Sequence, residues 1–518
     1  MSDPFLTREG HTSNKNHPFE EFLDGCATKP DQFLSAETEG GRGLDGFFSR
    51  YTSDDKEAPP SLTLLEIPEG HRPSREGLSR KLSMHSVGGG RAQLSTEEVV
   101  KVAAALYIQA SALVAGHPTN LRLPFGLLLS SLGAEDLKGV ELVGLLLSAA
   151  EKVSNEQYNR AKALLSQCTR SSSKYGSAVQ RVVYYFCDAL QERIDRETGE
   201  MSSKGNKKIG AMMPRDLMKA VLTNHPVQLI ANNTLPFTQV LHFTAIQALL
   251  DSVASARRIH IIDLSIKYGQ QWTFFLHGLA TRRSLPIESV TISAVGAAEE
   301  ILSMTGKRLW SFAESLSLHF KFKPVIIPDM KEMTESMFEL EVGEVVGIYT
   351  SLDMNNLIMR PESLDNVMRV FWKLKPCLVT VIDVEANHNS PSFIKRFTEA
   401  LFFYGAYFEC FDCLMEKSDE RRLMIEGVLS QGMKCTVAAE GSERVVRQVG
   451  VCVWRAFFRR FGLREADLSE WSMYQAHLLI KRFVEDNSCT LAMNSKALLV
   501  GWKGTPLHFV SAWKFQEE

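Results

Sequence analysis

A strand-like run that ends in an acid, followed by a short polar loop, is the part of this chain whose residue types best suit chemistry. It spans residues 259–272, and the candidate site residues within it are Ile259, His260, Ile261, Ile262, Asp263, Gly269, Gln271 and Trp272. The pattern predicts a buried parallel strand, a turn and a covering helix. The acid would then lie at the carboxyl end of the sheet, where α/β folds bind nucleotide ligands.

The spacing after Asp263 argues against a cofactor site. A methyltransferase of this architecture would place glycines at every second loop position, because a Cβ prevents close approach of a ligand and disfavours positive φ. Those positions hold Ser265, Lys267 and Gly269. We therefore predict a structural loop in which Asp263 accepts hydrogen bonds from backbone N–H groups and the turn carries Trp272 inward. Replacing Ser265 or Lys267 by glycine should change little beyond the entropy of the loop.

A second set of polar side chains follows a later predicted strand. Glu385, Asn387, His388 and Asn389 combine carboxylate, amide and imidazole groups, which can support acid–base chemistry. The sequence places no second base and no metal partner beside His388, so a hydrogen-bonded structural histidine is the favoured interpretation. No catalytic residue, cofactor or metal ion is predicted.

Composition narrows the class of protein. The chain has 518 residues, 44% of them hydrophobic and 23% charged, as is ordinary for globular proteins. Its net charge of −3 gives no overall attraction to nucleic acid or anionic membrane, and we expect neither a membrane span nor a secretory signal. Nine scattered cysteines suit reduced thiols in a nuclear or cytosolic protein. One CxxC pair, Cys410 and Cys413, lacks the second pair that a zinc site needs.

Residues 1–93 differ from the rest of the chain. Acidic patches alternate with aromatic residues such as Phe19, Phe22, Phe47 and Phe48, and prolines and serines interrupt the apolar runs. Such a tract cannot bury enough surface to offset its ordering entropy, so we predict disorder. The acidic-aromatic composition is also typical of activation or docking segments, with a solvated tail as the alternative.

Order is predicted to begin at a capping box, Ser95-Thr-Glu-Glu98. Apolar residues at helical spacing then predict four helices, at about 99–113, 142–153, 155–167 and 178–193. We expect these helices to form a cap over about 94–230, extended by a later helical insertion.

From about residue 236 the pattern alternates between strands and helices. Strand candidates lie at 259–264, 289–294, 345–349 and 377–384. Alternation of this kind predicts an α/β core over 231–518 with a doubly wound, Rossmann- or methyltransferase-like, mainly parallel sheet. We expect the first and last of these strands to be adjacent. Residues 497–502 and 507–513 predict a terminal β-hairpin.

Five ordered motifs resemble those of the GRAS family of plant transcriptional regulators, across about residues 140–518. Residues 141–150 are similar to the start of the first leucine-rich region, and 259–272 to the VHIID signature. Residues 384–389 with Arg396 are similar to the entry of the PFYRE region, and Gly441 with Arg444 to its end. The SAW motif matches three residues near the end, Trp502, Ser511 and Trp513.

The resemblance implies a non-enzymatic transcriptional regulator in the nucleus, with residues 94–518 as one GRAS domain. Its partners would be transcription factors and other GRAS proteins, with homo- or heterodimers expected, no small-molecule substrate, and direct DNA contact left open. Developmental and symbiotic roles both occur in the family. The N-terminal region lacks the Asp-Glu-Leu-Leu-Ala signature of the gibberellin-responsive subgroup, so binding to the gibberellin receptor is not expected.

Three alternatives stay open. Leu142, Leu145 and Leu146 fit the LxxLL motif that docks in coactivator grooves, or they form one buried helix face. Residues 455–461 mix arginine with aromatics, as nucleic-acid surfaces do, although an amphipathic helix is favoured. The alternative function is an S-adenosylmethionine-dependent methyltransferase, which rests on the sheet order and Asp263. Against it, no acid directly follows 291–296, where a ribose-binding carboxylate is expected.

Overall fold

The computed structural model describes residues 93–114, 132–199 and 225–516, except for residues 284, 417, 446, 485 and 486. These residues belong to one compact unit, Asp55–Glu518. The tail predicted for residues 1–93 lies outside the described residues, apart from its last residue. The predicted boundaries near residues 93 and 230 remain predictions.

Four helices predicted from apolar spacing are present. They are α4 (Thr96–Val114), α5 (Ala134–Ser154), α6 (Tyr158–Ser171) and α7 (Ala178–Glu197). The capping box before α4 is confirmed, because the Ser95 N–H donates to Glu98 Oε2 at 2.8 Å and the Glu98 N–H donates to Ser95 Oγ at 3.2 Å. These helices pack against one another and form the cap.

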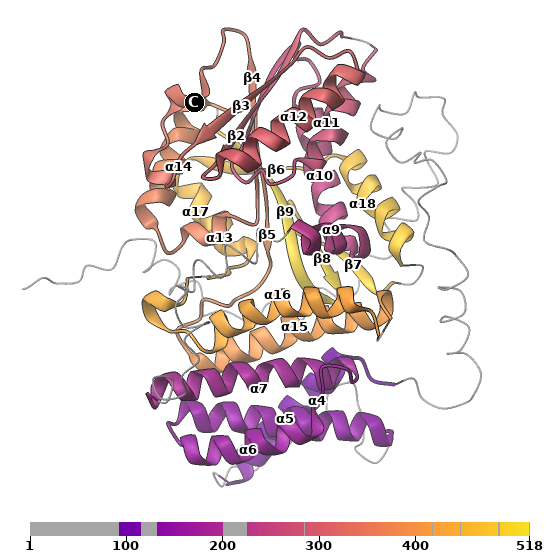
Figure 1. Ribbon diagram of the computed structural model, residues 1–518, viewed down its shortest axis with the longest axis vertical. Coiled ribbons are helices and arrows are strands. Elements are labelled where there is room, and N and C mark those ends of the chain that lie inside the picture. Colours follow the sequence, from indigo (N-terminus) through magenta and orange to yellow (C-terminus); the bar gives the residue numbers. More distant parts are fainter. Residues whose placement is uncertain are drawn as a thin grey trace, which may run out of the picture. The chain divides into compact units, whose positions relative to one another are not determined.

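Two later helices, α15 (Phe393–Leu414) and α16 (Glu420–Val437), pack against α7, as expected of a helical insertion (Figure 1). The fully buried Arg181 of α7 holds them there. It donates to Glu426 Oε1 at 2.9 Å, to Asp412 Oδ1 at 2.5 Å and to the Phe408 carbonyl at 2.9 Å. A buried guanidinium needs such partners, because an unpaired buried charge is very costly.

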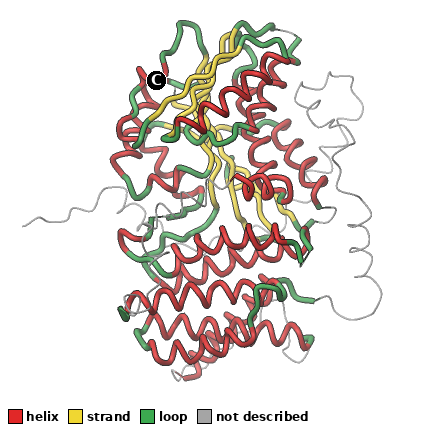
Figure 2. Tube along the Cα trace, in the orientation of Figure 1, coloured by secondary structure: helices red, strands yellow, loops and turns green. Residues whose placement is uncertain are grey.

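In the described part of the chain the sheet has nine strands in the order β3-β2-β1-β4-β5-β9-β8-β7, with β6 paired to β9. Figure 2 shows the strands in yellow between helices in red. Their bounds are β1 Arg258–Asp263, β2 Ser289–Gly296, β3 Phe320–Ile326, β4 Val345–Ser351, β5 Leu378–Val384, β6 Leu463–Ala466, β7 Cys489–Asn494, β8 Ala497–Trp502 and β9 Thr505–Phe515. Strands β1 to β5 pair in parallel, and β5 to β9 in antiparallel fashion. The mainly parallel half and the terminal hairpin of β8 and β9 are confirmed.

One expectation about the sheet was wrong. Strands β1 and β5 are parallel members of one sheet, but they are not adjacent, because β4 pairs with both. The chain winds outward from β1 through β2 to β3 and then crosses back to β4, as in a doubly wound fold. Strands β3, β6 and β7 were not predicted.

Helices cover both faces of the sheet. Figure 1 shows α10, α11, α12 and α18 on one side and α13, α14 and α17 on the other. The remaining bounds are α9 His225–Thr234, α10 Pro236–Ser252, α11 Gln270–Ala280, α12 Glu299–Ser315, α13 Met354–Leu357, α14 Pro361–Leu374, α17 Val451–Arg460 and α18 Glu470–Phe483, with 3-10 helices η7 Met330–Glu332, η8 Glu335–Phe338 and η9 Gly441–Glu443. Among the described residues, no helix has the length and apolar character to cross a membrane.

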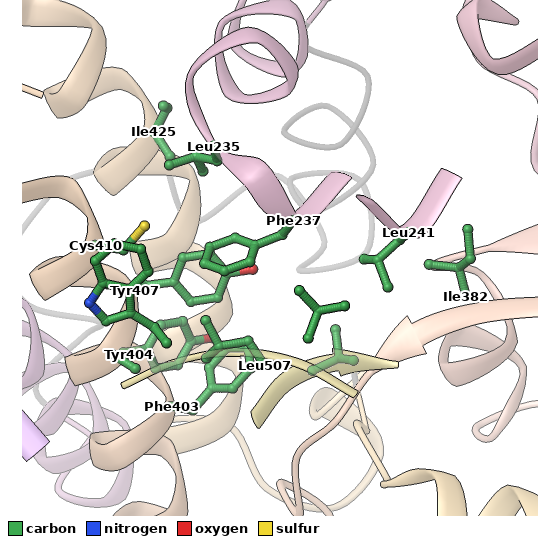
Figure 3. Close-up of a cluster of buried hydrophobic side chains, with 14 of the residues drawn as sticks. Leu235, Phe237, Leu241, Ile382, Phe403, Tyr404, Tyr407, Cys410, Ile425 and Leu507 are labelled. Carbon is green, nitrogen blue, oxygen red and sulfur yellow. The ribbon is translucent and has the colours of Figure 1, made fainter. Parts of the chain in front are cut away.

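A continuous apolar core joins the sheet to the helical cap. Figure 3 shows the part of it where Phe237 and Leu241 of α10 meet Ile382 of β5 and Tyr407 of α15. The rings of Phe237 and Tyr407 pack edge to face, with their centroids 5.4 Å apart. The sheet and the cap therefore hold each other in place.

Candidate functional site

The strand residues before Asp263 are core residues. Ile259, Ile261 and Ile262 are fully buried, and so is His260. Both ring nitrogens of His260 are occupied, Nδ1 by Glu344 Oε2 at 2.9 Å and Nε2 by Ser293 Oγ at 2.7 Å. Burial lowers the pKa of His260, against the opposing effect of Glu344. This histidine therefore joins β1 to β2 and to the start of β4.

Asp263 is the centre of a small hydrogen-bond network, which we call the Asp263 network: Asp263, Ser265, Gln271 and Trp272. The carboxylate is fully buried, and Oδ1 accepts from the Ser265 N–H at 2.8 Å. Oδ2 accepts from the Trp272 indole at 2.7 Å and from Gln271 Nε2 at 3.3 Å. Burial raises the pKa of Asp263 to about 7, although the bonds from Ser265 and Trp272 favour the charged form.

The loop after Asp263 is hydrogen-bonded to the end of β4 and to α12. The hydroxyl of Ser265 accepts from the backbone N–H of Ser351 at the end of β4, at 2.7 Å. The carbonyl of Lys267 accepts from Thr305 Oγ1 of α12, at 2.8 Å. Gly269 ends the loop with φ of 64°, where a Cβ would lie 3.0 Å from the Thr305 methyl. Thus the loop's own polar groups are used in contacts with the protein.

A second buried acid, Asp383, is the penultimate residue of β5, and it was not singled out from the sequence. Its Oδ1 accepts from Asn355 Nδ2 at 2.6 Å and from the Val384 N–H at 2.8 Å. Asn355 Oδ1 in turn accepts from the Val449 N–H at 3.2 Å. Burial raises the pKa of Asp383 to about 7. The signal was available, because Asp383 ends an apolar run just as Asp263 does.

Glu385, which the sequence analysis did single out, serves the start of a helix. Its Oε2 accepts from the N–H of Val451, the first residue of α17, at 2.8 Å. A carboxylate at the start of a helix accepts a hydrogen bond from an N–H that has no partner within the helix. It also interacts favourably with the positive end of the helix dipole. Burial raises the pKa of Glu385 to about 7.

The three polar residues that follow Glu385 differ in exposure. Asn387 is exposed, whereas His388 and Asn389 are buried. His388 Nδ1 lies 2.5 Å from Gln448 Oε1, and the ring is stacked on Tyr404 with centroids 6.0 Å apart. Burial lowers the pKa of His388 to about 4, so it is neutral at pH 7. Among the described residues, no group of three or more His, Cys, Asp or Glu could hold a metal ion.

Arg396 and Arg444 belong to a second polar centre, which we call the Glu440 cluster: Arg193, Arg396, Arg444, Arg447 and Glu440. Arg396 bonds to Glu440 Oε1 and donates to the carbonyls of Thr436 and Ser390 at 2.9 and 2.8 Å. Arg193 of α7 donates to Glu440 Oε1 at 2.7 Å and to the Val437 carbonyl at 3.1 Å.

The cluster closes over the end of α16. The carbonyls of Thr436 and Val437 lie in the last turn of that helix, so two guanidinium groups cap its negative end. Gly441, with φ of 53°, opens η9 directly after Glu440. Arg444 donates to the His388 carbonyl at 3.0 Å, which ties the segment after η9 to the loop after β5.

The three SAW-type residues lie inside the protein. Trp502, Ser511 and Trp513 are fully buried. Trp513 Nε1 donates to Ser511 Oγ at 2.9 Å, and its ring packs against Phe458 of α17 with centroids 4.8 Å apart. Residues Ser511 and Trp513 pair with Val381 and Val379 of β5. These residues therefore lie where the antiparallel half of the sheet joins the parallel half.

The burial of their side chains decides between the alternative interpretations of the LxxLL leucines and of residues 455–461. Leu142 and Leu146 lie in the core and Leu145 is partly buried against it, so the structure favours the buried helix face over the docking motif. In α17, Trp454, Phe457 and Phe458 are buried, and an aromatic ring must be exposed to stack on a base. The favoured interpretation of 455–461 as an amphipathic helix is confirmed.

The predicted site residues thus form three separate groups around a Rossmann-like α/β sheet with a helical cap. The model of the GRAS domain family matches residues 142–514 of this chain. The chain belongs to this family, whose DELLA members are plant transcriptional regulators.

Individual relatives agree with the family. The chain is similar to DELLA protein GAIP of Cucurbita maxima, with 30% identity over 382 residues, 73% of this chain and 63% of that protein. It is also similar to DELLA protein RGL1 of Arabidopsis thaliana, with 28% identity over 73% of this chain and 70% of that protein. The crystal structure of SCL7 from Oryza sativa has a TM-score of 0.63 and 27% identity, and the match covers 72% of this chain and 99% of that one.

Proposed function

We propose that this chain is a non-enzymatic transcriptional regulator. It acts in the nucleus through contacts with transcription factors and other GRAS proteins. The observation that carries the proposal is membership of the GRAS domain family across residues 142–514. The match covers only 63% of the length of the GAIP protein, so the partners and pathway of the whole relative do not transfer with it.

The geometry of the loop after β1 supports a role without a cofactor. Both oxygens of Asp263 are bonded to protein donors, and so are the Ser265 hydroxyl and the Lys267 carbonyl. A nucleoside entering here would have to displace these contacts. It would also meet the Cβ atoms of Ser265 and Lys267, where methyltransferases need glycine.

Calorimetry distinguishes the regulator from the methyltransferase. The full chain is titrated with S-adenosylmethionine, and a double variant with Ser265→Gly and Lys267→Gly serves as the matched comparison. We expect no heat of binding in either protein. Micromolar binding to the unaltered chain, with methyl transfer to any added protein, would overturn the regulator in favour of the enzyme.

A reporter assay tests the regulatory role. The acidic-aromatic segment 1–93 is fused to a neutral DNA-binding domain, and we expect increased reporter output that depends on Phe19, Phe22, Phe47 and Phe48. Replacing all four with alanine should remove the increase. Replacing Phe5 and Phe33, which lie outside the acidic-aromatic segments 18–24 and 44–48, is the matched control. Unchanged output in the fourfold variant would leave only a solvated tail.

Cell imaging and pull-down address location and partners. A fluorescent fusion of the full chain should accumulate in plant nuclei, and exclusion from nuclei would contradict the proposal. A pull-down from native tissue should recover transcription factors or other GRAS proteins. Repeating it after nuclease digestion separates protein contacts, which persist, from association through DNA, which is lost.

A further inference from the structure

Two buried thiols meet between two helices of the cap. All eight cysteines in the described part of the chain are free thiols. Cys168 of α6 is fully buried, and Cys187 of α7 is 6% exposed. The side chain of each of these two residues is a hydrogen-bond partner of the other. Their sulfur atoms are therefore neighbours in the folded protein.

The two helices form an antiparallel pair. The start of α6 is bonded to the end of α7, because the Tyr158 hydroxyl donates to Glu197 Oε2 at 2.8 Å. The end of α6 is bonded to the start of α7, because Gln180 Nε2 donates to the Ser171 carbonyl at 3.1 Å. A short connection between two packed helices produces this hairpin arrangement.

The register of this hairpin brings the two cysteines together. Cys168 lies ten residues after Tyr158 along α6, and Cys187 lies ten residues before Glu197 along α7. Both helices rise about 1.5 Å per residue, so the two cysteines lie at the same level of the antiparallel pair. Their meeting thus follows from the packing of the backbone and not only from the orientation of two side chains.

Helix α6 is held less firmly than α7. Its buried side chains are Ala161, Leu165 and Cys168, whereas α7 buries eleven residues. Figure 1 shows α6 on the side of the cap away from α15 and α16. Segments with few buried apolar side chains open locally most readily. Local opening of α6 gives a small oxidant access to Cys168.

The hydrogen bond makes the two thiols chemically unequal. It lowers the pKa of the Cys168 thiol, because the S–H of Cys187 stabilises the thiolate. The same bond, together with burial, raises the pKa of the Cys187 thiol. A thiolate is the nucleophile in reactions with peroxides. Cys168 is therefore the thiol that reacts first, and Cys187 is placed to react with its product.

We propose that Cys168 and Cys187 form a reversible disulfide when the protein meets hydrogen peroxide. The Cys168 thiolate attacks one peroxide oxygen, the O–O bond breaks, and hydroxide leaves, so that a sulfenic acid forms. The Cys187 sulfur then attacks the sulfenic sulfur, the S–S bond forms, and the S–OH group leaves as water with the proton of Cys187. Two thiols are oxidised and one peroxide is reduced to two waters.

The disulfide would fix α6 to α7 and prevent the local opening of α6. Nuclear and cytosolic reductants keep thiols reduced, so the bond would exist only under oxidation and would be reversed by dithiols. This inference does not depend on the proposed transcriptional role.

The test uses the full chain, reduced and then desalted. It is treated with hydrogen peroxide, its remaining thiols are alkylated, and a non-reduced digest is examined by mass spectrometry. We expect a cross-linked peptide joining Cys168 to Cys187 in native buffer, and no preference for this pair in urea. Oxidation should raise the melting temperature by about 2–5 °C, and dithiothreitol should reverse both changes.

Variants separate this disulfide from general oxidation. Cys168→Ala and Cys187→Ala should each lose the cross-link and the rise in melting temperature. Cys435→Ala removes another buried thiol, in α16, and is the matched control that should keep both. Absence of the Cys168–Cys187 cross-link in the native chain would overturn the proposal. So would an equal rise in melting temperature on oxidation of Cys187→Ala.

Discussion

The Asp263 network lies at the end of β1 and the Glu440 cluster contacts the loop after β5, but the two are built in opposite ways. Every partner of Asp263 in its network lies within nine residues of it along the chain. In the Glu440 cluster, Arg193 and Glu440 are 247 residues apart, and Arg396 and Glu440 are 44 apart. Asp263 and Trp272 at the centre of the first network are fully buried, whereas the second opens to solvent at Glu440.

The difference indicates different mechanical roles. The Asp263 network fixes one strand-to-helix turn and the orientation of one tryptophan. The Glu440 cluster connects α7 of the cap, the end of α16 and the loop after β5, so it couples regions that the chain itself does not keep together. Removing a central group should therefore have a local effect in the first case and a global effect in the second.

The largest effect is expected for Arg396→Met. This change removes the donor to two buried carbonyls and the partner of Glu440, while it keeps much of the side-chain volume. Each buried carbonyl left without its donor costs about 1–3 kcal/mol, and loss of the pair with the exposed Glu440 adds about 0–1 kcal/mol. Urea unfolding should show this loss, and hydrogen exchange should rise in α7 and α16 together.

Arg421→Met is the matched control. Arg421 lies in α16, its side chain is 61% exposed, and it pairs with Asp419. Exposed pairs contribute about 0–1 kcal/mol, so this variant should be nearly as stable as the unaltered protein. Equal losses in the two variants would mean that the Glu440 cluster has no special role in joining cap and sheet.

A smaller and more local effect is expected for Asp263→Ala. The indole of Trp272, the amide of Gln271 and the Ser265 N–H lose their common acceptor, at a cost of about 1–3 kcal/mol. Hydrogen exchange should rise in the loop and the first turn of α11 but not in α7. Unchanged stability combined with loss of small-molecule binding would instead make Asp263 a ligand-binding residue.

The contribution of the Asp263 carboxyl group to the free energy of unfolding should decrease as the pH rises. Its pKa is raised from its ordinary value of 3.8 to about 7 by burial, so between these values the folded protein holds a proton that the unfolded chain releases. The contribution of Asp263 is therefore present in full below about pH 4 and is lost as the pH rises through 7. Asp263→Asn cannot titrate, so its stability relative to the unaltered protein should increase from pH 4 to pH 7. A difference that does not vary with pH would contradict the raised pKa.

The two networks also explain what the sequence could predict. The strand, loop and helix around Asp263 are consecutive, so their pattern of apolar and polar residues predicted both the fold and the inward turn of Trp272. The capping box before α4 was predicted for the same reason. Strand β3 was missed because Lys321, Lys323 and Pro324 suit an edge strand or a loop equally well.

Contacts between distant segments were not predictable from one sequence. Asp383 meets Asn355 across 28 residues, and Asn355 meets Val449 across 94, so no local pattern marks them as partners. Arg193 was not singled out, because an arginine on an amphipathic helix is usually on the surface. Only the folded chain shows that it is buried against the end of α16.

The smallest effect distinguishes two neighbouring loop residues. Ser265→Gly and Lys267→Gly add similar entropy to the unfolded chain, about 0.5–1 kcal/mol each. From the sequence we expected little more than this from either change. The structure revises the expectation for Ser265, because its hydroxyl accepts from the Ser351 N–H at 2.7 Å and the glycine variant leaves that donor without a partner. The contact made by Lys267 uses its carbonyl, which the substitution retains. Ser265→Gly should therefore be less stable than Lys267→Gly by about 1 kcal/mol in urea unfolding. Equal stabilities would show that the Ser351 N–H finds another acceptor in the Ser265→Gly variant.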